Sequence, residues 1–358
     1  MNKFKPQLLP NNKVGEPVNW EERIERPEDW LYSNKLDGAR IELFADGTVK
    51  GRSLKPIPSA HVQQMGNDIM ASIPLINENC IIECEFYSPE MNFAEIMHFF
   101  RCADVTSEKE VKKYQKLWNK SGGDPALGWT FPGRTVEWLT TWHKSLKFCA
   151  FDVINVNSPE ETKYKRMLNL ANYTRQHVNG YASLEPDIEM IPQHSFDHID
   201  NLYQAYDQAI ISNYEGVVVM HKDSTYKFGR HTLNAKQAFK IKNDDVEFDG
   251  QILDVEESTV AREGSERTVN ELGRSKTSQL KEDRVPSGMA KGFLVKMDDG
   301  NTLTVSLKNY NHDERRDLLE NADEWIGLWI KFTGMHPVKE GGCPRHAHYT
   351  KGNVRDEK

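Results

Sequence analysis

The chain has 358 residues and a mass of 41.2 kDa, a length typical of two or three domains. It is 38% hydrophobic and 28% charged, so it can form a sizeable core, and global disorder is excluded. The formal net charge of −8 argues against a general nucleic-acid binder, which is usually basic.

Three features of the sequence indicate the cellular compartment: the apolar runs, the N-terminus and the cysteines. No run approaches the ~18 consecutive apolar residues that a membrane span needs, and no secretory signal opens the chain. The five cysteines are few, odd in number and scattered, which does not suit a disulfide framework. The sequence therefore predicts a cytoplasmic protein with reduced thiols and no membrane association.

The first 243 residues predict a domain that mixes helices and strands. An irregular N-terminal arm precedes a hairpin whose turn is Asp46-Gly47. Helices are expected at 60–73, 93–101, 165–178 and 198–212, and strands at 80–87, 148–156, 214–220 and 239–242. Residues 107–145 differ, with a basic helix expected at 112–120 and then a tryptophan-rich stretch, and we interpret them as an insertion.

After residue 243 the pattern changes to short strands separated by turns. These strands are expected at 248–255, 292–297, 302–307 and 328–332, with one helix at 313–325. Short strands with one inserted helix are typical of a small barrel, so we expect domains at 1–243 and 244–358. Residues 259–291 hold seven basic and five acidic residues and few apolar ones. We interpret them as a long exposed loop that could hold phosphates.

The sharpest functional pattern is the run Lys35-Leu36-Asp37-Gly38-Ala39-Arg40. By itself such a short run is more often a charged loop before a hairpin. The functional alternative is a lysine nucleophile, whose pKa must be lowered by burial beside other cations before it can attack. That alternative predicts further basic residues around Lys35, together with acidic residues that hold a metal.

Suitable side chains follow in chain order, most of them at the ends of predicted strands: Arg52, Glu85, Phe151, Glu215, Lys240 and Lys242. Each also has an ordinary structural explanation. The two lysines, for example, could lie on the solvent-exposed face of an edge strand. Lys240 and Lys242 share one face of their strand, because residues two apart point the same way. Together and in this order, the residues are far more specific than any one of them.

In this order the motifs resemble those of the covalent nucleotidyltransferase superfamily. Over nearly its whole length the chain resembles the compact, bacteriophage-type ATP-dependent DNA ligases. The resemblance implies an α+β fold, in which an adenylation (nucleotidyltransferase) domain with ATP-grasp-like antiparallel sheets and helices precedes a C-terminal OB-fold β-barrel. It also implies that Lys35 forms the covalent bond to AMP and that Arg40 contacts the bound nucleotide.

The other roles are implied by the same resemblance. Arg52, in Gly51-Arg52-Ser53, would hold the 5′-phosphate at a nick, and Ser33 would meet the adenine edge. Phe151 would stack on adenine, and Glu85 would bind the ribose. The remaining expected contacts are a metal held by Glu215 with Glu85, the α-phosphate held by Lys240 and Lys242, and Arg345 as the best match to the last, arginine-rich motif, with Arg355 second.

Four motifs depart from the family pattern. In the last, the spacing around Arg345 and Arg355 is altered. The third reads Glu83-Cys84-Glu85 in place of Asp-Gly-Glu, Met220 stands where the fourth usually ends in lysine, and Phe239 replaces the tryptophan of the fifth. A separate group, His336, Cys343, His346 and His348, fits no standard zinc spacing.

The sequence thus predicts a monomeric enzyme that seals nicked duplex DNA in replication, repair or recombination. ATP and Mg²⁺ (or Mn²⁺) are the expected cofactors, and contacts to DNA are expected mainly at backbone phosphates, with 259–291 as a candidate clamp. The alternatives are an RNA ligase, an mRNA-capping-type nucleotidyltransferase, and a catalytically silent module that binds nucleic-acid ends.

Overall fold

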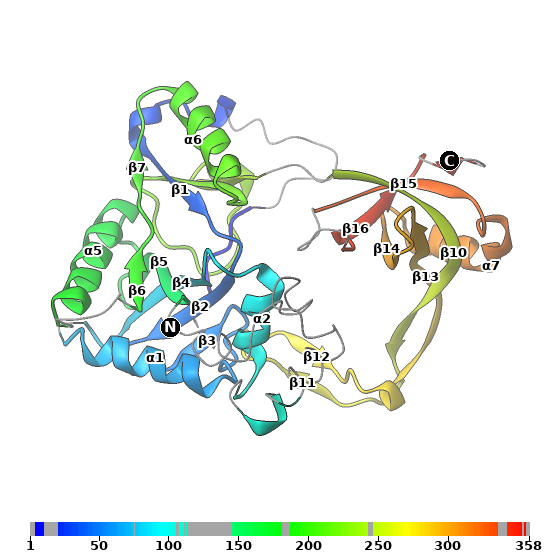
Figure 1. Cartoon of the computed structure of the whole chain (residues 1–358), viewed down its shortest axis with the longest axis horizontal. Helices are drawn as coiled ribbons and strands as arrows, with labels where there is room; N and C mark the ends of the chain where they lie inside the picture. Colours follow the sequence, from blue (N-terminus) through cyan, green and yellow to red (C-terminus); the bar gives the residue numbers. More distant parts are fainter. Residues whose placement is uncertain are drawn as a thin grey trace. The chain divides into compact units, whose positions relative to one another are not determined.

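A computed structural model divides the chain into two units, Met1–Asn243 and Asp244–Lys358, each of which is described by itself (Figure 1). The structure describes residues 4–10, 21–74, 76–104, 107–110, 112, 145–180, 187–242, 246–335, 342–352 and 354–355. Most of the expected insertion at 107–145, including nearly all of its basic helix, lies outside these residues. Within them, no helix is long and apolar enough to cross a membrane.

Two sheets form the first unit. The five-stranded sheet has the order β3 (Val49–Gly51), β2 (Ala39–Phe44), β4 (Cys80–Tyr87), β5 (Lys147–Asn155), β6 (Ile188–Met190). The four-stranded sheet has the order β7 (His194–Ser195), β1 (Trp30–Lys35), β8 (Gly216–His221), β9 (Ala238–Lys242). Neighbouring strands are antiparallel except β5 and β6, which are parallel.

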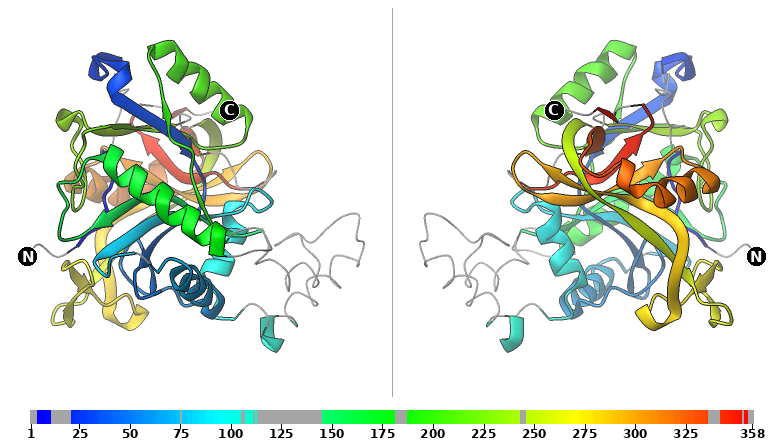
Figure 2. Two further views of the ribbon diagram at one scale, coloured as in Figure 1. Left: turned by 90° about the vertical axis from the view of Figure 1, so that its left-hand side faces the viewer. Right: turned by 90° about the vertical axis from the view of Figure 1, so that its right-hand side faces the viewer.

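Helices cover both sheets of the first unit. They are α1 (Ala60–Ala71), α2 (Phe93–Arg101), α5 (Lys163–Gly180) and α6 (Ile199–Ile211), with short 3₁₀ turns η1 (Glu21–Arg23), η2 (Pro27–Asp29) and η4 (Leu233–Ala235). The first three helices bury Val62, Ile96 and Leu170 in the core of the five-stranded sheet, and Figure 2 shows α5 lying across that sheet. Leu202 of α6 packs instead on the four-stranded sheet, against the core that includes Val217.

The run from Lys35 to Arg40 passes from one sheet to the other. Lys35 is the last residue of β1 in the four-stranded sheet, and Arg40 lies in β2 of the five-stranded sheet. The turn between them approaches β4 closely, because a Cβ on Gly38 would lie only 2.5 Å from the carbonyl oxygen of Phe86. Glycine is therefore required at this position, and the turn joins the two sheets at the place where the candidate residues gather.

The second unit is a closed ring of strands. These are β10 (Val246–Ala261), β13 (Arg284–Met297), β14 (Thr302–Lys308), β16 (Arg345–Thr350) and β15 (Trp329–Met335), and β17 (Val354–Arg355) is added beside β15. The ring closes because β10 pairs with both β13 and β15. Helix α7 (His312–Glu320) and the turn η6 (Ala322–Glu324) lie between β14 and β15 in the chain. This is the expected OB-fold, and the α+β fold class is confirmed.

The prediction that residues 259–291 form a long loop is wrong. Residues 259–261 continue β10, which pairs with β13 as far as Arg284, and η5 (Lys281–Asp283) leads into β13. Between them, β11 (Arg267–Val269) and β12 (Ser275–Thr277) form a two-stranded ribbon. We call residues 259–291 the extended hairpin. Its side chains are largely exposed, so it shows no apolar alternation by which a strand could be recognised.

Candidate active site

The two sheets bring Lys35 next to Glu215. The side chains form an ion pair, and the backbone N–H of Glu215 donates to the Lys35 carbonyl oxygen at 2.9 Å. Only 25% of the lysine side chain and 16% of the glutamate side chain are exposed. Gly216, which follows Glu215, has φ +138° and would overlap with the carbonyl oxygen of Ile241 if it had a side chain. The glycine therefore allows β8 and β9 to pair closely beside Lys35.

Burial and neighbouring cations from β9 lower the pKa of the lysine amine. Burial lowers the pKa of Lys35, and the charges of Lys240 and Lys242 lower it further, whereas Glu85 and Asp37 act in the opposite direction. The register explains this proximity, because Lys242 lies opposite Gly216, the strand residue that is also paired with Lys35. A neutral amine is thus easier to form at Lys35 than in a solvated lysine, as nucleophilic attack requires.

Lys240 lies near three other cations. Burial lowers the pKa of Lys240, and the charges of Lys242, Arg230 and Arg52 lower it further. Arg52 is an exposed residue that follows β3, so the five-stranded sheet contributes to this group as well. Arg230 was not among the residues expected from sequence. It lies between β8 and β9, where an isolated arginine gives no pattern, and it donates to the Leu9 carbonyl oxygen at 2.6 Å.

Glu85 is the carboxyl group that faces this positive charge from β4. Burial raises its pKa to about 7, although Lys35 and Arg40 act to lower it. A hydrogen bond from the backbone of Gly38 also favours the charged form. Glu85 and Glu215 thus lie on different sheets with Lys35 between their charges, and both can supply oxygen ligands.

Glu85→Gln should make the free energy of unfolding less dependent on pH. The wild-type carboxyl holds its proton to about pH 7 in the folded state, but loses it near its ordinary pKa of about 4.3 once unfolded. Between these values the folded state binds more protons, so the free energy of unfolding falls as pH rises, by up to about 4 kcal/mol. Urea unfolding of both proteins across this range measures the difference. The exposed Glu78→Gln should leave the wild-type slope intact, and an equal slope in Glu85→Gln would contradict this assignment.

Arg40 is held inside the first unit by several partners. Its Nε donates to Glu42 at 3.0 Å, its Nη1 donates to the Gln7 carbonyl oxygen at 2.7 Å, and its Nη2 is paired with Glu83. Its guanidinium carbon lies 5.1 Å from the centre of the Phe151 ring. Arg40 therefore fixes the N-terminal arm and lies over the Phe151 ring. Its expected contact to the nucleotide stays a prediction.

Phe151 is positioned by a buried ion cluster that sequence reasoning missed. The Phe151 carbonyl oxygen accepts hydrogen bonds from Lys163 Nζ at 2.6 Å and from Gln193 Nε2 at 3.2 Å. Asp152, the next residue, is paired with Arg166 at 2.9 Å and with Lys163 at 3.4 Å. The only sequence signal is that Lys163 and Arg166 lie three apart on α5, on the same face of the helix.

Three further residues are expected from the sequence to belong to the site. Ser33 is buried on β1, two residues before Lys35 and opposite Val218. Arg345 begins β16 in the second unit and is described apart from the first-unit residues. Arg355, the second candidate, is ion-paired with Asp249 in the same unit.

The residues present suit a nucleotide with a divalent cation. Phe151 is partly exposed and offers a ring for stacking, and Lys240, Lys242 and Arg52 offer charges for phosphates. Mg²⁺ is usually bound by one or two carboxylates together with substrate phosphates, which fits the separate Glu85 and Glu215 better than a cage of acids would.

Comparisons with known proteins agree with this geometry. Residues 16–242 match the family model described as ATP dependent DNA ligase domain. A comparison with curated protein sequences found no match. Among solved structures, the chain is similar to a Lig E DNA ligase, with a TM-score of 0.58 and 18% identity over 98% of this chain and 99% of that one. It is also similar to the structure named Pmar-Lig, with a TM-score of 0.62 and 14% identity over 97% of this chain and 67% of that one.

At these identities the solved structures show a shared fold, and the family model adds the sequence evidence. The family model spans more than half of the chain and includes every first-unit residue expected from the sequence to be part of the site. The chain therefore belongs to the family of ATP-dependent DNA ligases.

Proposed function

We propose that this ligase seals nicks between a 3′-hydroxyl and a 5′-phosphate in duplex DNA through a covalent lysyl-AMP. The observation that supports this most is the amine of Lys35, which is buried beside Lys240 and Lys242 and has a lowered pKa. The use of ATP and action on DNA follow from the family. The residue roles, the metal and the nicked substrate are the parts we propose.

The first step transfers AMP to the enzyme. Nζ of Lys35, which is ion-paired with Glu215, releases one proton to water, and the neutral amine attacks the α-phosphorus of ATP. A phosphorus–nitrogen bond forms, the bond to the β-phosphate oxygen breaks, pyrophosphate leaves, and the nitrogen releases a second proton to water. Lys240 and Lys242 stabilise the negative charge that develops on the α-phosphate oxygens. Mg²⁺ held by Glu85 and Glu215 would neutralise further charge on the phosphates.

The remaining steps move AMP to DNA and then release it. An oxygen of the 5′-phosphate attacks the phosphorus of lysyl-AMP, so the phosphorus–nitrogen bond breaks and the lysine regains its amine. The 3′-hydroxyl then attacks the activated 5′-phosphorus, loses its proton and displaces AMP. We assign Arg52 to the 5′-phosphate, and Phe151 and Ser33 to adenine. Arg345 is proposed as the nucleotide-binding residue of the last, arginine-rich motif.

The extended hairpin is the proposed clamp on DNA. It holds seven basic and five acidic residues in a chain whose net charge is −8. Arg274 and Lys276 are exposed on and beside β12. Phosphate contacts by such residues release counterions, so binding should weaken as salt rises. We also propose a cytoplasmic location, since all five cysteines are described and none is in a disulfide. A monomeric state is part of the same proposal.

A sealing assay on labelled nicked duplexes tests the proposed function. We expect joining with ATP and Mg²⁺ on a DNA nick, little with GTP, and less when RNA strands replace DNA. Arg274→Ala with Lys276→Ala should weaken binding to nicked DNA by about tenfold at low salt and leave lysyl-AMP formation intact. Preference for RNA ends, or for GTP, would instead identify an RNA ligase or a capping-type enzyme. Strong ATP-dependent adenylation with no joining of any nick would refute the nick-sealing proposal.

A further inference from the structure

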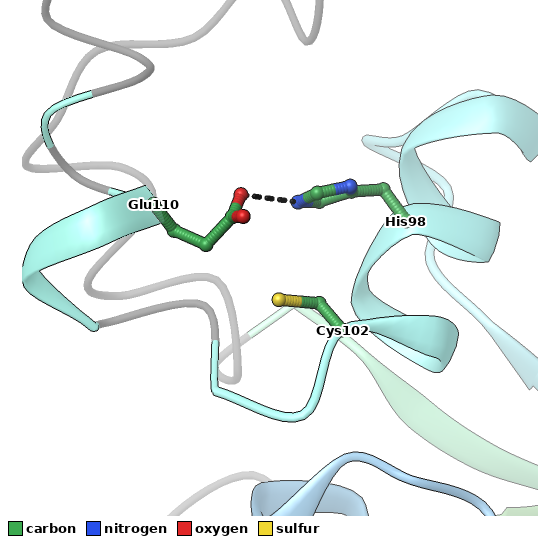
Figure 3. A group of neighbouring side chains, drawn as sticks. All are labelled: His98, Cys102 and Glu110. Carbon is green, nitrogen blue, oxygen red and sulfur yellow. Dashed lines mark ion pairs between the residues drawn. The ribbon is translucent and has the colours of Figure 1, made fainter.

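Three side chains with metal-binding atoms meet beside α2. They are His98, Cys102 and Glu110, and Figure 3 shows all three pointing toward one another. His98 Nε2 lies 3.7 Å from Glu110 Oε2, and the nitrogen, sulfur and oxygen atoms of the three residues all lie within 4.8 Å of one another. In the part of the chain that the structure describes, this is the one group of three or more such residues that meets so closely.

The geometry of α2 places two of these residues together. His98 and Cys102 are four residues apart, one turn of helix, and the backbone N–H of Cys102 donates to the His98 carbonyl oxygen at 2.9 Å. The helix is itself well fixed. A capping box between Asn92 and Glu95 stabilises its start, and Phe99 is fully buried in the core. The His98 ligand atom is thus presented from a rigid helix, and the Cys102 sulfur from the residue that caps its end.

Glu110 reaches the pair from the next segment of chain. Ser107 starts this segment, with its hydroxyl donating to the Asp104 carbonyl oxygen at 2.8 Å, and residues 108–110 are helical. The side chain of Glu110 is 16% exposed and that of His98 is 15% exposed, so both lie largely out of solvent. A carboxylate and an imidazole are therefore held together beside a thiol in a partly buried place.

We propose that His98, Cys102 and Glu110 bind a zinc ion. Zinc accepts one nitrogen, one sulfur and one oxygen ligand, whereas Mg²⁺ and Ca²⁺ require oxygen ligands. Zinc bonds of about 2.0–2.2 Å to nitrogen and oxygen in a tetrahedral site place these two ligand atoms about 3.3–3.6 Å apart, and the 3.7 Å between His98 Nε2 and Glu110 Oε2 is close to this range. Three protein ligands leave one position for water. Cys102 binds as the thiolate, so binding releases a proton.

The ion would have a structural role. None of its three ligands belongs to the proposed adenylation site, and the ion joins α2 to the segment that leads into residues 113–144 of the sequence. Zinc should therefore protect this connection, including the trypsin sites after Lys109 and Lys112, without being needed for lysyl-AMP formation. The inference is independent of the nick-sealing proposal, because zinc binding is measured without ATP or DNA.

Metal titration of the full-length protein after chelation tests the site. We expect one zinc per chain, and cobalt in its place should give a thiolate-to-metal charge-transfer band. Cys102→Ser should remove the band and weaken zinc binding by at least ~100-fold, and His98→Ala and Glu110→Gln should weaken it by ~10-fold or more. Cys343→Ser is the matched control, since Cys343 is another partly buried thiol, and it should change neither.

Three results would overturn the proposal. They are less than stoichiometric zinc in the wild type, zinc affinity that is unchanged in Cys102→Ser, and a cobalt band that is lost in Cys343→Ser but kept in Cys102→Ser. Trypsin cleavage after Lys109 that is equally fast with and without zinc would also contradict the structural role. A loss of lysyl-AMP formation in Cys102→Ser at normal stability would show that the site acts in catalysis instead.

Discussion

Replacing Lys35 by arginine should abolish the covalent adenylate and reduce sealing of nicked DNA by at least ~10³-fold, about 4 kcal/mol of activation free energy. Arginine keeps a positive charge for Glu215 to pair with, so the local charge changes little. Its guanidinium stays protonated, however, and cannot attack phosphorus. The loss should therefore be chemical, and labelled ATP with gel electrophoresis measures it directly.

Two controls separate a lost nucleophile from a misfolded site. Lys165→Arg alters a lysine on α5 whose side chain is 63% exposed, and it should form the adenylate normally. Nicked DNA that already has AMP on its 5′-phosphate needs no lysyl-AMP, so Lys35→Arg should still seal it. If Lys35→Arg forms the adenylate from ATP, Lys35 is not the nucleophile. If it also fails on adenylated DNA, the substitution has damaged more than the first step.

Arg166→Met should lower the free energy of unfolding by about 3–5 kcal/mol, because it leaves a buried carboxylate with one cation in place of two. Asp152 accepts from Arg166 Nε at 2.9 Å and from Nη2 at 3.1 Å, and both side chains are buried. Burial would raise the pKa of Asp152, but Arg166 and then Lys163 hold it below its usual value. Arg166 also donates to the carbonyl oxygens of Glu161 and Ser224, so it joins β5 to the chain that follows β8.

Urea unfolding measures this loss, with Arg175→Met as the matched control. Arg175 lies on the same helix and is exposed, so its substitution should cost less than about 0.5 kcal/mol. Because Lys163 also binds the Phe151 carbonyl oxygen, Arg166→Met should in addition weaken ATP binding under folding conditions. A loss below about 1 kcal/mol for Arg166→Met would mean that the cluster contributes little net stability, as some buried ion pairs do.

Much of the first unit could be predicted because its motifs end regular strands. Lys35 ends β1 and Glu215 precedes β8, so an apolar strand beside a charged residue identified both positions. The cluster around Asp152 could not be predicted in the same way. Lys163 and Arg166 lie in a polar stretch at the start of a helix, where charged residues are usually solvated, and only the packing of α5 on β5 buries them.

The extended hairpin and the zinc ligands show two further limits of the sequence. A two-stranded ribbon that buries neither face has no alternating apolar pattern, so β11 and β12 resembled a loop. The proposed zinc ligands fit no standard spacing, because His98 lies on α2, Cys102 directly follows its last residue, and Glu110 lies in the next segment. His346, His348 and Cys343, which lie close together in the sequence, form no such group in the described residues.

The most direct test of the central claim is to locate the AMP on the protein. After incubation with ATP and Mg²⁺, intact mass should rise by one AMP, and peptide mapping should place it on the peptide that contains Lys35, with cleavage after that lysine blocked. The bond should break in acid, as expected for a phosphoramide. AMP found on another residue, or no covalent AMP under conditions in which nicks are sealed, would contradict the account.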